Sequence, residues 1–145
     1  MSLAAWKGFG WLTTHQASRD ELRDLLSAVE RDLKSSAADG LDPDWAMTIA
    51  YNAALQVGAA ALAASGYRAA RDQHHYRIIQ SLPHTLKVDE RIVTKLDRFR
   101  KKRNEAAYER AGVASEGDAR AMKELAITLR DDLLAWLRKH HPELM

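Results

Sequence analysis

The stretch Asp42–Gly66, DPDWAMTIAYNAALQVGAAALAASG, decides the fold class of this chain of 145 residues. It opens with a capping carboxylate at Asp42, a proline where no amide donor is needed, and a second acid near the positive end of the helix dipole. Ser65 and Gly66 close it. Between these ends, large apolar residues lie among many alanines, whose small side chains let a neighbouring helix approach closely. The stretch therefore predicts the central helix of a helical protein.

Other segments carry helical signals of the same kind. Ser18 and Glu21 form a capping-box pattern ahead of leucines at helical spacing. We expect Pro83 to stop one of the later helices. The expected helices run from Ser18 to the Ser35–Gly40 segment, from Asp72 to Leu82, from about Asp89 to Gly112, and from Ser115 into the run Arg138–His141. Because no alternating strand pattern of useful length and no repeat occurs, the sequence predicts an all-α helical bundle in one domain spanning 1–145.

Aromatic residues cluster near the start of the chain, at Trp6, Phe9 and Trp11. A lysine and two glycines interrupt this stretch before the apolar core of a signal peptide could form. We therefore expect residues 1–17 to be a loosely attached arm, whose aromatic side chains either pack on the bundle or contact a partner.

The composition excludes some classes of function. The chain has no cysteine, so disulfides, thiolate zinc sites and thiol nucleophiles are excluded. Its 22 basic and 20 acidic side chains give a net charge of +2, which is too small to identify a nucleic-acid binder through the overall field. No segment is expected to approach a membrane-spanning length. The sequence thus favours a cytoplasmic protein without a membrane partner.

Familiar catalytic and metal-binding motifs are missing from the sequence. His74 and His75 are adjacent, and neighbouring residues of a helix point about 100° apart, so the pair is poorly placed to chelate one ion. A half-buried histidine with a satisfied ring is the preferred interpretation. The chain also has no glycine-rich phosphate loop, no HExxH pattern and no GxSxG elbow. We therefore expect no metal and no cofactor.

The helix expected at 89–112 is strongly basic. Between residues 91 and 110, eight basic residues stand against three acids, a local net charge of +5. The basic residues are Arg91, Lys95, Arg98, Arg100, Lys101, Lys102, Arg103 and Arg110. A charged helix is usually a solvated face, and that interpretation remains open.

Arg103 favours a second interpretation of this helix, as part of a binding site for an anion. The apolar residues Ile92, Leu96 and Phe99 step by four and three, and position 103 is the next on that stripe. A guanidinium there would be desolvated unless it met a carboxylate, a phosphate or a subunit interface. Asn104 and Tyr108 are four residues apart and share one helix face beside it. Arginine, amide and phenol together form a compact donor set suited to an anion such as phosphate.

Four stretches of the sequence, in this order and with this spacing, resemble the HEPN (higher eukaryotes and prokaryotes nucleotide-binding) domains. The likeness covers roughly residues 18–140. It rests on Trp45–Ala54 (WAMTIAYNAA), Ala64–Arg68 (ASGYR), His74–His75 and Phe99–Tyr108 (FRKKRNEAAY). The resemblance implies an up-and-down bundle of four to five helices. It also implies a homodimer in which the arginine-bearing helices of two subunits face one another across a cleft.

The resemblance further implies a class of activity. Active HEPN proteins are metal-independent ribonucleases, often toxins of toxin–antitoxin pairs, and some members are paired with small nucleotidyltransferases. Their motif is an arginine, a polar residue and then a histidine four to six positions after the arginine. Arg103 and Asn104 match it, but position 108 is tyrosine, and no histidine occurs between His84 and His140.

This departure from the motif bears on catalysis. A tyrosine with a pKa near 10 is almost wholly protonated at pH 7 and is a poor base for the ribose 2′-hydroxyl, although it could donate a hydrogen bond or stack on a nucleobase.

Three functions are therefore carried forward. The leading one is a dimeric, non-catalytic protein that binds RNA or a nucleotide, or an accessory component of a toxin–antitoxin or nucleotidyltransferase-associated system. Its candidate binding residues are Arg100, Lys101, Arg103, Asn104 and Tyr108. The second is a metal-independent ribonuclease in which Arg103, Asn104 and Tyr108 act, with Tyr108 in place of the histidine. The third is a purely structural interaction domain, with Arg103 paired to an acid from another helix.

Overall fold

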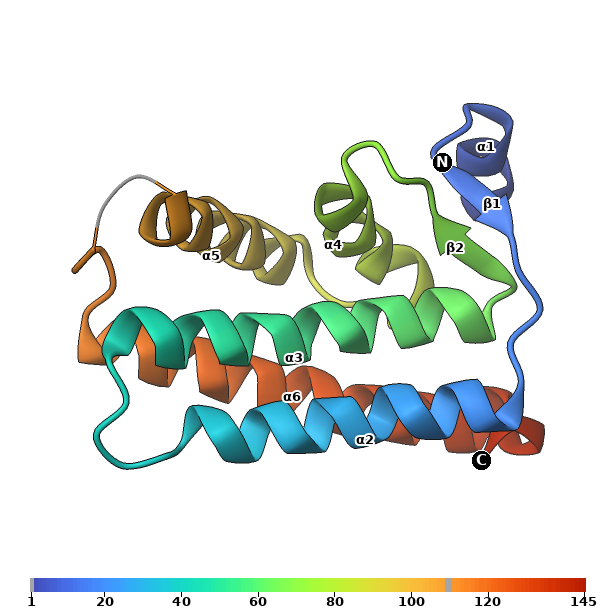
Figure 1. The fold of residues 1–145 in the computed structure, drawn as a ribbon. Coiled ribbons are helices and arrows are strands. Elements are labelled where there is room, and N and C mark those ends of the chain that lie inside the picture. Colours follow the sequence, from blue (N-terminus) through green and yellow to red (C-terminus); the bar gives the residue numbers. More distant parts are fainter. Residues whose placement is uncertain (1, 109–110) are drawn as a thin grey trace.

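The computed structural model describes residues 2–108 and 111–145, without the side chain of Tyr108. Helices dominate the chain, which confirms the predicted all-α bundle. The long helices alternate in direction: α2 and α5 run opposite to α3 and α6 (Figure 1). In chain order the elements are α1 Leu3–Gly8, β1 Leu12–Thr14, α2 Arg19–Ser36, α3 Pro43–Ala64, β2 Tyr67–Ala69, α4 His74–Thr85, α5 Glu90–Tyr108, α6 Glu116–His140 and a 3-10 turn at Pro142–Leu144.

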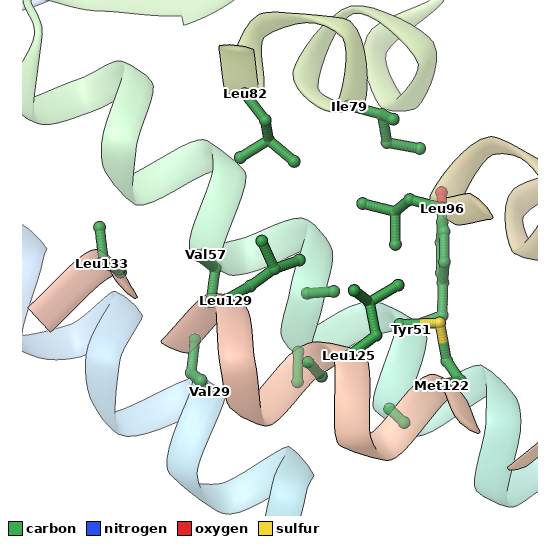
Figure 2. Packing of buried hydrophobic residues seen from close by; sticks show 14 of the residues in the cluster. Val29, Tyr51, Val57, Ile79, Leu82, Leu96, Met122, Leu125, Leu129 and Leu133 are labelled. Atoms are coloured by element: carbon green, nitrogen blue, oxygen red, sulfur yellow. The ribbon is translucent and has the colours of Figure 1, made fainter. Parts of the chain in front are cut away.

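Helix α3 is the central helix, as its alanine-rich sequence predicts. It packs against α2 and α6 on one side and against α4 and α5 on the other (Figure 1). The core between these helices is built from Val29 of α2, Leu96 of α5 and several leucines of α6, around the fully buried Tyr51 of α3 (Figure 2). Each large apolar side chain buried in this way stabilises the fold by roughly 1.5–3 kcal/mol.

The helix starts predicted at Ser18 and Asp42 carry the expected side-chain caps, but the second bond of the predicted capping box at Ser18 is missing. Ser18 Oγ accepts from the amide of Glu21 (3.1 Å), and Asp42 accepts from the amide of Asp44 (2.9 Å). The Glu21 carboxylate does not return to the helix start as a capping box requires. It binds the ring of His15 instead, at 2.6 and 2.8 Å from Nε2. The nearby imidazole therefore takes the place of the backbone amide as the partner of this carboxylate.

Residues 2–17 are not the loosely attached arm that the sequence analysis expects. Helix α1 buries Trp6, and β1 pairs antiparallel with β2, with Leu12 opposite Ala69 and Thr14 opposite Tyr67. Trp6 and Leu12 form a second apolar cluster with residues of α3, β2 and α4. Each strand has only three residues, and an alternating pattern of that length is too short to predict a strand from the sequence.

Two other helix boundaries differ from the expectation. Pro83 does not stop α4, which continues to Thr85, because a proline in the last turn removes a single amide donor and the Leu86 amide still bonds the Leu82 carbonyl (3.0 Å). The helix begins at His74 rather than Asp72, after Gln73 in the left-handed conformation (φ 52°). Helix α5 is described to Tyr108. Of the rest of its expected span, residues 109–110 lie outside the described residues, and residues 111–112 are not helical, with Gly112 at a positive φ of 77° that ends a helix.

Helix α3 also corrects an expectation about membranes. The sequence analysis expects no segment of membrane-spanning length, yet α3 has 22 residues and is apolar enough to pass a test of length and composition. The core helix of a bundle passes the same test, and 61% of the tested window is buried inside the protein. This helix is therefore weak support for a membrane span.

Gly58 allows the closest approach between α3 and α4. A Cβ atom on this residue would lie 2.5 Å from Ile78 Cγ2 and 3.6 Å from the Ile78 carbonyl oxygen. We expect Gly58→Val to lower the free energy of unfolding by about 1–3 kcal/mol, because α4 must move away from α3. Urea unfolding followed by circular dichroism measures this. Gly117→Ala, at a helical position whose Cβ would meet only Ser115 Oγ at 3.6 Å, is the control and should cost nothing. An unchanged stability of Gly58→Val would contradict the close packing.

Candidate functional site

A cavity of about 520 Å³ lies where the start of α4 meets the middle of α5. This size falls within the range of small-molecule sites in proteins. Its lining residues are Gln73, His74, His75, Tyr76, Arg100 and Asn104. The pocket thus combines polar and aromatic groups from two helices that are joined by packing on α3.

The start of α4, which contributes His74, His75 and Tyr76 to this pocket, lacks a side-chain cap among the described residues. The first amides of a helix have no acceptor within the helix, and side-chain oxygens usually satisfy some of them. The residue before α4 is Gln73, and among the described residues no side chain caps this helix. The first turn of α4 therefore keeps amide donors that no side chain satisfies, on the helix that lines the pocket together with Arg100 and Asn104.

Arg103 is held against the core rather than in open water. Its side chain is half-buried, and its Cζ atom lies 6.0 Å from the centre of the buried Tyr51 ring. One terminal nitrogen donates to Asn104 Oδ1 (3.1 Å). Its Nε atom is buried without a hydrogen-bond partner, and it is the single such side-chain atom in the part of the chain that the structure describes. A buried donor left unpaired costs about 1–3 kcal/mol, so this atom needs a further explanation.

The structure brings some of the candidate binding residues together and separates others. Arg100 and Asn104 line the pocket, and Arg103 lies against Asn104. Arg100 is also bound to Asp97, with Nε 2.7 Å from Oδ1. Lys101 is exposed, pairs with Asp97 Oδ2 (3.4 Å) and does not line the pocket. The side chain of Tyr108 lies outside the described residues.

His74 and His75 belong to this pocket, which the sequence analysis did not foresee. In the sequence the two histidines are interpreted as satisfied rings rather than a metal pair, and they form one stretch of the resemblance to HEPN domains. Their ring centres are 6.1 Å apart, and the described residues contain no group of three or more acidic, histidine or cysteine side chains that could hold a metal ion. The pair itself was visible in the sequence, but its position over α5 follows from how α4 packs, which no local pattern encodes.

His75 is joined to the core through Tyr51. Its Nδ1 lies 3.3 Å from the Tyr51 hydroxyl. Burial raises the pKa of Tyr51 although Arg103 opposes this, so the phenol stays protonated and can donate to the imidazole. Burial, followed by the positive charge of Arg103, lowers the pKa of His75. His75 is therefore neutral at pH 7, with Nδ1 available as an acceptor.

The ring of His74 has a defined tautomer. Its Nδ1 lies 3.3 Å from the carbonyl oxygen of Ala70, and a carbonyl can only accept, so Nδ1 carries the proton. In the neutral ring Nε2 then holds a lone pair. His74 thus contributes an imidazole to the pocket that also contains Arg100.

Comparisons of the chain with models of protein families, with curated proteins and with solved structures found no match. The chemistry of the pocket must therefore be judged from its own residues. Arg100, the amide of Asn104, the uncapped start of α4 and the neutral imidazole of His75 are together suited to hold an oxyanion, with Arg103 bonded to Asn104 beside them.

The pKa of His75 provides a test of this geometry. We expect nuclear magnetic resonance to give His75 a pKa below its ordinary value of about 6.5, and Arg103→Leu to raise that pKa, because one of the neighbouring positive charges is removed. Because the unfolded chain takes up the proton more readily, the wild type should lose stability as the pH falls through about 6.5 and below. His75→Gln should lose less over the same range. A pKa at or above the ordinary value would contradict the burial and charge described here.

Proposed function

We propose that this protein binds a phosphate group of RNA or of a nucleotide in the pocket between α4 and α5. One observation carries the proposal: Arg103 Nε is buried without a hydrogen-bond partner, next to the pocket residue Asn104. A phosphate oxygen is an acceptor that could meet the guanidinium system and the free amides of α4 together.

The charge around the pocket supports a phosphate over a neutral ligand. Arg100 and Arg103 both lie close enough to lower the pKa of His75. Asp97 offsets part of the charge of Arg100, whereas the guanidinium of Arg103 is bound to the neutral amide of Asn104. Hydrogen bonds to charged groups contribute about 1.5–3 kcal/mol each, so a phosphate bound by both arginines could be held in water without a metal ion.

The resemblance to HEPN domains supports a wider proposal. The chain would act as a dimeric accessory protein of a toxin–antitoxin or nucleotidyltransferase-associated system, with α5 of two copies facing one another. The support is the basic stretch at residues 91–110 and the match of Arg103 and Asn104 to the family motif. Sedimentation of the purified protein, with and without Arg103→Ala, tests whether a dimer forms through this helix.

Loss of the Arg103 guanidinium should weaken phosphate binding. We expect Arg103→Ala to weaken binding of uridine monophosphate at least tenfold in calorimetric titration, because the two charge-assisted bonds that Arg103 could make are lost. Arg98→Ala is the matched control, since Arg98 is exposed on the same helix and, unlike Arg103, is bonded to no pocket residue within the part of the chain that the structure describes; its affinity should stay within twofold of the wild type. Equal affinities of all three proteins would refute the proposed site.

A second candidate function is metal-independent cleavage of RNA, and the observation that favours it is His74. The sequence analysis looked for a base on α5 and found Tyr108, whereas α4 supplies an imidazole with a free Nε2 in the same pocket as Arg100. That nitrogen would accept the ribose 2′-hydroxyl proton while the 2′-oxygen attacks phosphorus. The bond to the 5′-oxygen then breaks and this oxygen takes a proton from water, giving a 2′,3′-cyclic phosphate and a 5′-hydroxyl.

RNA incubated with the wild type in EDTA separates this candidate from simple binding. Cleavage that is lost in His74→Gln, with uridine monophosphate binding retained, would support the ribonuclease. Intact RNA at high protein concentration would reject it and leave the binding proposal in place. The third candidate, a structural domain, predicts a pair between Arg103 and an acid of another helix; among the described residues no ion pair joins Arg103 to another helix.

A further inference from the structure

A row of aromatic rings and guanidinium groups leads away from the pocket. The Arg100 guanidinium lies 5.5 Å from the centre of the Tyr76 ring, and Arg77 lies 5.5 Å from the same ring. The guanidinium of Arg77 also covers the Trp11 ring at 3.7 Å. The ring of Phe9 follows, with its centre 4.9 Å from that of Trp11. Five side chains from three separate stretches of the sequence are thus linked, from α5 through α4 to the segment between α1 and β1.

The row follows the arrangement of the elements that carry it. Helix α1, the β1–β2 pair, α4 and α5 stand side by side over the same face of α3 (Figure 1). The buried Trp6 packs against the row, with the centre of its ring 5.6 Å from that of Trp11 in an edge-to-face arrangement. At the far end Phe9 is 55% exposed, although a phenylalanine is normally buried. The row is therefore anchored in the fold and still open at the surface.

Arg77 is the most informative member of the row. Within the described residues its guanidinium contacts two rings and no carboxylate. Isolated contacts between a cation and a ring occur about once in 70–80 residues and need no functional explanation. Here three cation–ring contacts follow one another directly, so that aromatic rings and guanidinium groups alternate from Trp11 through Arg77 and Tyr76 to Arg100.

We propose that this row, Phe9, Trp11, Arg77, Tyr76 and Arg100, is a track for a single-stranded polynucleotide. The inference rests on the proposed function, because the pocket would hold one phosphate of the strand, and it names the ligand class as an extended strand rather than a free nucleotide. Unpaired bases stack on aromatic rings and on arginine planes, and each stacked base contributes about 1–3 kcal/mol. The guanidinium of Arg77, which lies between Trp11 and Tyr76, would meet a phosphate of the next nucleotide.

The same chemistry disfavours other occupants. The bases of a duplex are already stacked on one another, so their faces are not free for Tyr76 or Phe9. An acidic peptide could pair with Arg77 and Arg100 but would leave the exposed phenylalanine unused. A single nucleotide would fill only the pocket end of the row. Affinity that grows with the length of a single strand is therefore the property that this track predicts.

Fluorescence anisotropy with uridine monophosphate as competitor and with labelled oligouridylates tests this directly. For the wild type, affinity should rise at least tenfold from the monophosphate to a strand of about twelve nucleotides, which exceeds the smaller site sizes of such grooves. Phe9→Ala, at an exposed position that the core does not need, should remove at least threefold of that gain and leave binding of the monophosphate unchanged. Trp45→Ala is the matched control, because Trp45 is 64% exposed and belongs to α3 rather than to the row. It should behave as the wild type.

The outcomes separate this inference from the proposed function. Monophosphate binding without a gain for longer strands, or a gain that Phe9→Ala leaves intact, overturns the track and leaves the phosphate pocket standing. Failure to bind either ligand overturns both. Oligothymidylate of the same length distinguishes the sources of a single strand: weaker binding than to oligouridylate identifies RNA as the ligand, whereas equal binding identifies single-stranded nucleic acid in general.

Discussion

A buried guanidinium nitrogen needs an acceptor, and this requirement links the fold to the function proposed here. Arg103 occupies the position after Leu96 and Phe99 on the inward stripe of α5, where an apolar side chain would serve packing better. Its aliphatic stem can lie along apolar surface. Its Nε atom has no partner among the described residues. The free protein carries this cost beside Asn104, a residue of a pocket that is lined by polar and aromatic side chains, which is the arrangement expected of a preorganised anion site.

The central helix makes this arrangement possible. Because α3 is rich in alanine and has a glycine at position 58, α4 lies close against it and its first residues reach the middle of α5. Tyr51 of the same helix lies under the site and bonds His75. The close packing of α4 on α3 and the position of the two pocket histidines thus depend on the same helix, α3. The row of rings beyond the pocket depends on it as well, since Tyr76 and Arg77 belong to the same turn of α4.

The sequence predicts the long helices well, because caps and apolar stripes are local signals. It also indicates Arg103, since a charge on an apolar stripe is visible without a structure. It offers packing of the N-terminal aromatic residues on the bundle as one alternative, but it does not predict the strand β1, because a strand of three residues gains its stability from pairing with β2, 55 residues away. Nor does it place His74 and His75 beside Arg100, because that contact depends on where α4 begins and how it packs on α3. In general, contacts between residues of different helices cannot be predicted from the sequence pattern of each helix alone.

The most direct measurement of the central claim is the free energy of unfolding of wild type and Arg103→Leu, with and without uridine monophosphate. If the guanidinium is kept for an anion, the variant should equal or exceed the wild type in stability without ligand, by up to about 1–3 kcal/mol. The nucleotide should then stabilise only the wild type. A variant that is clearly less stable than the wild type without ligand, and that the nucleotide stabilises equally, would show that Arg103 serves the fold and not a phosphate.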